Sequence, residues 1–182
     1  MEIQSVIKQF EYYKGLGEKT IEVLSDEELH LEPAVNANSI SIIVKHMWGN
    51  MLSRWTNFLS EDGEKEWRKR DEEFEVTIKT REELIEKWNE GWKCLFDALN
   101  SLKPEDLAKT IYIRNKGQSA EEAIHRQLAH YSYHIGQIVY LGKIIKGEDW
   151  ESLSIPIGGS KAFNEERFSQ EKEMKHYTDD LK

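Results

Sequence analysis

The fold is decided by the stretch Ser119–Gly147, which reads SAEEAIHRQLAHYSYHIGQIVYLGKIIKG. Ser119 followed by Glu122 forms a capping box, a signature of helix N-termini, and Gly147 is a typical residue at a helix C-terminus. Between them the stretch contains no proline, and its apolar residues recur at helical spacing. The sequence therefore predicts one long helix that ends at about Lys146.

Two histidines stand four residues apart in this helix. At ~100° per residue, His130 and His134 differ by about 40°, so they lie on one face within reach of a single ion. Neutral imidazole is a good ligand for Zn, Ni, Fe or Cu, but surface histidines and hydrogen-bonded core histidines also occur at this spacing. The residue after His130 is Tyr131. A zincin protease needs a glutamate there as its base, so that class is disfavoured.

Working outward, three further helices fit the long proline-free segments of the chain. Each has an apolar stripe at helical spacing, and the second and third begin at residues that commonly cap helices. We expect them from about Ile3 to Leu24, from Ser39 toward Ser60, and from Thr80 to Pro104.

The connections complete the fold prediction. The run Thr110–Arg114 is rich in β-branched and aromatic residues and predicts a short extended segment, closed by the turn-forming residues 115–117. An irregular C-terminal tail should begin at Glu148. We predict an all-α protein, a four-helix bundle. Residues 1–170 would form its single domain, and residues 171–182 a charged C-terminal tail.

Composition excludes several classes of protein. The 182 residues include 25 basic and 34 acidic ones, a net charge of -9, so nucleic acid is an unexpected partner. No apolar stretch is long enough to span a membrane and no signal peptide is recognisable, so we expect no membrane association and a cytoplasmic location. Cys94 is the only cysteine, and it lies in an apolar helical stretch where a thiol behaves as a small hydrophobe.

His46 is a third candidate ligand, in the middle of the second expected helix. From periodicity alone it fits equally well as a metal ligand or as part of a polar helix face. His125 lies about 140° round its helix from the His130 position, so it should face solvent or a neighbouring helix. His30 and His176 lie in charged segments and are expected to be solvated.

Two segments resemble the DinB-like (YfiT-like) superfamily of metal-dependent enzymes. Residues 45–50 read KHMWGN and residues 126–138 read RQLAHYSYHIGQI. In the tail, residues 154–156 (SIP) and 163–164 (FN) are similar to a branch known mainly as a domain of unknown function. The resemblance covers most of the chain and implies a four-helix bundle whose second helix supplies one metal ligand and whose fourth supplies two. Carried onto this sequence, the ligands are His46, His130 and His134.

The resemblance also limits the reaction. Characterised members include S-transferases that use bacillithiol or mycothiol, and a maleylpyruvate isomerase. We therefore expect one divalent metal ion, Zn or Ni, and a low-molecular-weight thiol as a further cofactor. Three imidazoles leave the ion an open position, which is typical of catalytic sites. Thiol-dependent S-transfer to a small-molecule substrate is the first hypothesis. The alternatives are a metal-dependent hydrolase, a non-catalytic binding module stabilised by the metal, and a metal-free scaffold that recognises a partner.

Residues near the ligands could orient them. Asn50 and Gln127 lie at angles close to those of the histidines, and each could hydrogen-bond a ring nitrogen and fix its tautomer. Ordinary polar packing would explain them as well. Tyr131 and Tyr133 are weaker candidates for proton transfer.

The fourth helix carries a second apolar stripe, about 120° to 180° from His130. It consists of Ile124, Leu128, Ile135 and Val139. Either a neighbouring helix of the same chain or a second subunit could cover it. Because dimers are common in the superfamily that the chain resembles, we predict a homodimer built in part on this helix.

Overall fold

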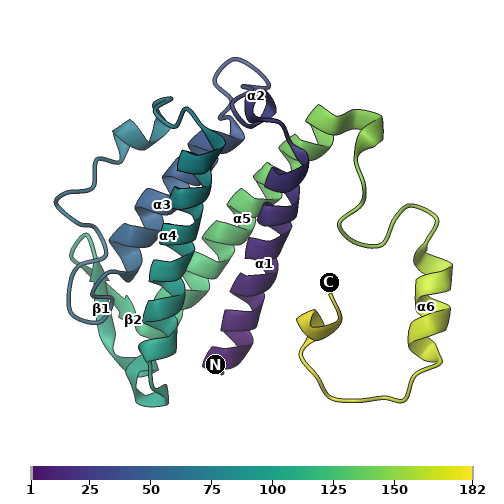
Figure 1. Cartoon of the computed structure of the whole chain (residues 1–182). Helices are drawn as coiled ribbons and strands as arrows, with labels where there is room; N and C mark the ends of the chain where they lie inside the picture. Colours follow the sequence, from purple (N-terminus) through teal and green to yellow (C-terminus); the bar gives the residue numbers. More distant parts are fainter. Residues whose placement is uncertain (1, 182) are drawn as a thin grey trace.

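The computed structural model describes residues 2–181, and within them the chain is mostly helical with one small two-stranded sheet (Figure 1). The α-helices are α1 (Ile3–Val23), α2 (Asp26–Leu29), α3 (Ile40–Trp55), α4 (Arg81–Ser101), α5 (Ala120–Lys146) and α6 (Ser160–Phe168). The 3-10 helices are η1 (Asp71–Phe74), η2 (Pro104–Ala108), η3 (Gly147–Asp149) and η4 (Tyr177–Asp180). The strands are β1 (Thr110–Ile113) and β2 (Lys116–Ser119). The all-α prediction broadly fits.

Polar side chains begin three of the long helices where the sequence predicted them. The hydroxyl oxygens of Ser39, Thr80 and Ser119 accept hydrogen bonds from the backbone N–H groups three residues later. Each such cap contributes about 1 kcal/mol. Helix α5 ends at Gly147, whose φ of 56° suits a residue without a Cβ. Helix α3 ends at Trp55, before the predicted end near Ser60, and Asn57 then adopts a left-handed φ of 52°.

The four long helices α1, α3, α4 and α5 enclose the core, with α1 against α5, α3 against α4, and α3 against α5. Each contributes one buried aromatic ring to the centre: Phe10, Trp55, Trp92 and Tyr131. The Phe10 ring lies 6.4, 6.4 and 6.0 Å from the other three ring centroids. Burying such a side chain contributes roughly 1.5–3 kcal/mol. The helices are therefore packed around an aromatic centre, and its Tyr131 ring also lies 5.5 Å from the ring of His130.

The predicted extended segment is half of a β-hairpin. Strand β1 pairs antiparallel with β2 through a two-residue turn, Arg114-Asn115, in which both residues have positive φ (54° and 60°). That turn geometry matches the twist of the strands. The carboxylate of Asp62 accepts hydrogen bonds from both turn N–H groups, at 2.8 and 2.9 Å. The hairpin is thereby attached to the connector that follows α3.

The C-terminal segment is more ordered than predicted. It contains α6 and η4, so the expectation of a wholly irregular tail was wrong, since residues 160–168 form a regular helix. In Figure 1 this segment extends from the end of α5 and returns toward α1. Asp179 pairs with Lys8 at 2.7 Å, and His176 bonds the Ser5 hydroxyl at 3.2 Å, so His176 is not simply solvated. The division of the chain at residue 170 stays a prediction.

Part of the second apolar stripe on α5 is covered within the chain. Ile124 and Ile135 are 0% and 1% exposed, whereas Leu128 and Val139 are only partly buried against the core. The first pair is unavailable to a second subunit. The homodimer stays a prediction, and any interface on this stripe is restricted to Leu128 and Val139.

Within residues 2–181, none of the helices combines the length and apolar character needed to cross a bilayer.

Candidate metal centre

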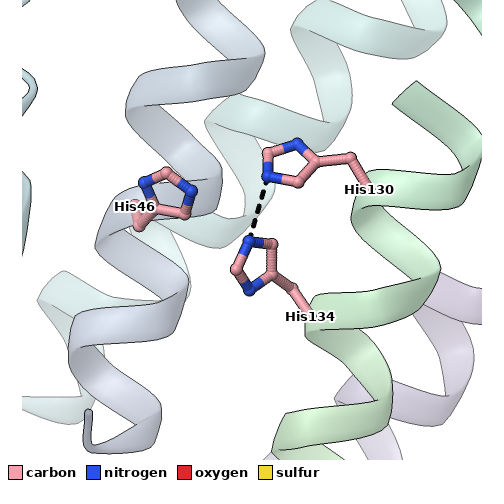
Figure 2. Close-up of side chains that lie close together, drawn as sticks. All are labelled: His46, His130 and His134. Carbon is pink, nitrogen blue, oxygen red and sulfur yellow. Dashed lines mark hydrogen bonds between the residues drawn. The ribbon is translucent and has the colours of Figure 1, made fainter. Parts of the chain in front are cut away.

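Three histidines from two helices meet on one side of the core. His46 projects from α3 toward His130 and His134, which come from successive turns of α5 (Figure 2). The ring centroid of His46 lies 5.6 Å from that of His130 and 4.9 Å from that of His134. One nitrogen from each ring can be chosen so that all three lie within 4.8 Å of one another. The three predicted ligands are therefore brought together.

The two nitrogens that face each other on α5 are close. Nε2 of His130 and Nε2 of His134 lie 3.0 Å apart, the contact drawn dashed in Figure 2. Two nitrogens at ~2.0–2.1 Å from one tetrahedral ion would be about 3.3 Å apart. The observed separation is close to that value, so the two rings can share a cation with little movement.

Each ring has a side-chain oxygen at its other nitrogen. Nδ1 of His46 donates to the Glu73 carboxylate at 2.9 Å, and Nδ1 of His134 donates to the Gln137 amide oxygen at 2.8 Å. Nδ1 of His130 donates to the Gln127 amide oxygen over 3.4 Å, a weaker contact. A proton on Nδ1 leaves the lone pair on Nε2. Oxygen acceptors of this kind fix the tautomer and orientation of metal-binding histidines.

Glu73 is the most firmly held of these acceptors. It is 5% exposed, and Arg68 binds both of its oxygens, from Nε at 2.7 Å and from Nη2 at 2.9 Å. The Glu73 side chain approaches α3 so closely that position 49 must be a glycine. A Cβ built on Gly49 would overlap Oε1 of Glu73 and lie 2.9 Å from Cδ of Glu73. The glycine of the KHMWGN segment thus has a specific steric role one turn after His46.

The protonation states suit a metal site. Burial lowers the pKa of His130 to about 3, helped by the neighbouring imidazoles of His134 and His46. Burial also lowers the pKa of His134, although its bond to Gln137 acts the other way. For Glu73, burial raises the carboxyl pKa, but hydrogen bonds from His46 and Arg68 outweigh it and the pKa lies below its ordinary value. A neutral imidazole is the form that binds metal, and an ionised Glu73 is the form that accepts a hydrogen bond from His46.

Of the two residues predicted to orient the histidines, Gln127 contacts a ring nitrogen and Asn50 has other partners. Gln127 does face a ring nitrogen, that of His130. Asn50 does not: its Oδ1 accepts a hydrogen bond from the Tyr131 hydroxyl at 3.0 Å, and that hydroxyl also accepts from Trp55 Nε1 at 3.1 Å. Asn50 thus connects α3 to the aromatic core. Tyr131 is fully buried, and its hydroxyl is engaged by Asn50 and Trp55.

Sequence reasoning missed Glu73, Arg68 and Gln137. Glu73 lies 27 residues from His46 in an acidic connector, among Asp71, Glu72 and Glu75, and nothing local distinguishes it. Gln137 carried a usable signal, since it stands three residues after His134 on the same helix face.

The other candidate residues lie elsewhere. His125 is exposed, as predicted. His30 is half-buried and bonds the backbone carbonyl of Ile78 at 3.0 Å, so its expected solvation was wrong. Cys94 is half-buried beside Thr56, and burial raises its thiol pKa, which disfavours a reactive thiolate.

Comparison with known proteins gives a family but no activity. Residues 2–159 match the family described as "Protein of unknown function (DUF1572)". No curated protein and no solved structure matches the chain.

Proposed function

The chain belongs to the DUF1572 family of proteins of unknown function, and on that premise we propose that it is a divalent-metal-dependent enzyme with the DinB-like four-helix fold. His46, His130 and His134 would hold one ion, Zn or Ni. The observation that carries the proposal is that all three Nδ1 atoms lie beside side-chain oxygens while the three rings also offer nitrogens within 4.8 Å of one another.

The donor set favours a catalytic role over a structural one. Closed structural zinc sites have four protein ligands, whereas three histidines leave a position for substrate or water. When bound, a divalent ion supplies Lewis-acid chemistry and lowers the pKa of a thiol or water at that position. This chain's own residues orient the imidazoles, and burial favours the neutral forms of His130 and His134 by lowering the pKa of each.

The reaction proposed first is S-transfer with a low-molecular-weight thiol, acting on a small-molecule substrate. It rests on the resemblance to the DinB-like superfamily. Metal-dependent hydrolysis is the alternative reaction, since the same donor set would activate water. In cobalt-substituted protein, a small thiol should change the visible absorption spectrum, and the change should vanish in His130→Ala. A response to azide but to no thiol would favour hydrolysis.

The alternative to an enzyme is a binding module in which the metal only stabilises the helices. The aromatic core of Phe10, Trp55, Trp92 and Tyr131 argues against it, since these rings pack directly against one another and need no metal ion to do so. We expect helicity and cooperative unfolding to survive chelation of the metal, unlike the behaviour of a zinc finger. Loss of the folded state on chelation would support the stabilising role instead.

Elemental analysis of untagged protein tests the metal site directly. Wild type should carry about one divalent ion per chain, and the variants His46→Ala, His130→Ala and His134→Ala should each lose most of it. His125→Ala is the matched control, because it removes an exposed imidazole from the same helix. Equal metal content in all four variants, or metal-free wild type, would reject the site.

A further inference from the structure

A small polar cavity adjoins the histidine cluster. Its volume is ≈ 260 Å³, and His46 and His130 form part of its wall. The rest of the wall is mostly arginine, supplied by α3, the connector, the hairpin turn and α5: Arg54, Arg68, Arg70, Arg114 and Arg126. Five guanidinium groups around so small a space are unexpected in a protein whose net charge is -9.

The carboxylates nearby do not balance these cations. Glu64 Oε2 is shared among three of the arginines, lying 3.1, 3.3 and 3.2 Å from Arg54, Arg68 and Arg114. Glu73 is bound to Arg68 and to His46. Guanidinium groups remain charged at all ordinary pH values. The cavity therefore carries excess positive charge before any metal ion is added.

Two of the arginines have donors that the protein does not use. Arg54 is 7% exposed, yet its buried Nε has no hydrogen-bond partner among the described residues. A buried N–H without an acceptor costs about 1–3 kcal/mol, and this one belongs to a side chain that lines the cavity. Arg126 is exposed and pairs with no side chain within residues 2–181.

The guanidinium group of Arg70 is positioned by an aromatic ring rather than by a carboxylate. Its guanidinium lies 5.3 Å from the centre of the Phe74 ring, and that ring stacks on His46 with centroids 5.1 Å apart. Its nearest carboxylate is that of Asp71, at the long distance of 3.9 Å. The stacking holds the cation beside the candidate metal ligands while leaving its donors available.

Arg68 differs from the rest, because its donors are occupied by Glu73 and Glu64. It supports the histidine cluster, whereas Arg54, Arg70, Arg114 and Arg126 face the cavity with spare donors or shared partners.

We infer that this cavity binds the anionic group of the substrate, a carboxylate or a phosphate, beside the position held for the metal ion. The inference rests on the proposed function, because the metal ion beside the anion is part of that proposal. It names the substrate class as small anionic molecules. The planar donor fork of arginine matches both groups. The volume lies just under the ~300–1,000 Å³ of pockets for drug-sized ligands, so the bound portion is compact.

The test uses full-length protein, with and without added cobalt, titrated calorimetrically with inorganic phosphate and separately with malonate. At least one of these anions should bind to wild type. Arg126→Gln and Arg70→Gln should each weaken that binding by about tenfold, since charge-assisted hydrogen bonds are the strong class. Arg167→Gln is the charge-matched control: Arg167 pairs with Asp180 and lies in α6, outside the cavity wall. It should leave anion binding unchanged.

The outcomes separate this inference from the metal site. Failure of both anions to bind wild type at millimolar concentration, or equal binding in Arg126→Gln, Arg70→Gln and Arg167→Gln, overturns the inference even if the protein holds metal. If the protein takes up no metal but still binds an anion through these arginines, the anion site is supported and the proposed metal site is rejected. Tighter binding of malonate would indicate a carboxylate substrate, and tighter binding of inorganic phosphate would indicate a phosphate substrate.

Discussion

The carboxylate of Glu73 accepts a hydrogen bond from Nδ1 of His46 at 2.9 Å, although the two residues are 27 positions apart and belong to different elements. Arg68 binds both oxygens of the same carboxylate. The orientation of His46, on a regular helix, therefore depends on a 3-10 turn in the connector. The first prediction follows from this dependence.

Replacing Glu73 with glutamine should weaken metal binding by about 10–100-fold, the usual effect of losing such a partner. The amide keeps the size of the side chain but removes the charge that favours His46 as a ligand. Competition with a metallochromic chelator measures the affinity. Glu72→Gln is the control, because the Glu72 side chain is exposed and pairs with Lys69. Identical affinities in the two variants would show that Glu73 does not support the site.

Gly49→Ala should disturb the site through Glu73. Alanine is the better helix former by roughly 0.5–1 kcal/mol, but its Cβ would overlap the Glu73 carboxylate. We expect reduced metal affinity with the helix content retained, from circular dichroism and chelator competition on the same sample. Gly15→Ala on α1, where an added Cβ meets nothing within 4 Å, should be neutral or stabilising. Unaltered metal affinity in Gly49→Ala would contradict the steric role.

The metal-free protein should lose stability as the pH falls below about 6.5. The folded-state pKa of His130 is lowered from 6.5 to about 3 by burial, and that of His134 is also lowered. Between these values the unfolded chain binds more protons, so the stabilising contribution is fully present above the unfolded pKa and is lost progressively as the pH falls toward the folded one. Urea unfolding at several pH values measures the loss. It should be smaller in His130→Gln than in wild type or in the exposed control His125→Gln, and equal slopes would refute the prediction.

Tyr131→Phe should destabilise the fold without removing metal. The change leaves the Asn50 amide oxygen and the Trp55 indole N–H buried without their shared hydroxyl partner. The expected cost is about 1–3 kcal/mol in the free energy of unfolding. Tyr133→Phe, at a side chain that is 63% exposed, should change stability by less than about 0.5 kcal/mol. Loss of metal from Tyr131→Phe with stability intact would assign the hydroxyl to the site instead.

Light scattering at micromolar concentration tests the predicted homodimer. A mass near 21.4 kDa means a monomer and rejects it. About twice that mass, reduced in Leu128→Glu without loss of helicity, would place the half-buried Leu128 at the subunit interface. The chain itself buries Ile124 and Ile135, so substitutions there would damage the core and cannot serve as the test.

The long helices and their starting residues were predictable because capping and periodicity are local properties. Ser119 with Glu122, and the four-residue spacing of His130 and His134, are visible in a few turns of sequence. The sequence could not place Glu73, because its partner His46 is distant along the chain and the connector between them has no periodicity. Strand β2 was missed for a related reason: Lys116–Ser119 contains Gly117 and no aliphatic residue, so only its pairing with β1 makes it a strand.

The three histidines stand on regular helices, whereas Arg68, Arg70 and Arg114 stand on the connector and on the hairpin turn. Irregular segments accept substitutions, insertions and deletions that a packed helix does not tolerate. Substitutions at Arg70 and Arg114 can therefore change what the cavity selects, provided that Arg68 and Glu73, which hold His46, are kept. Engineering of the cavity's anion preference should begin at those two positions.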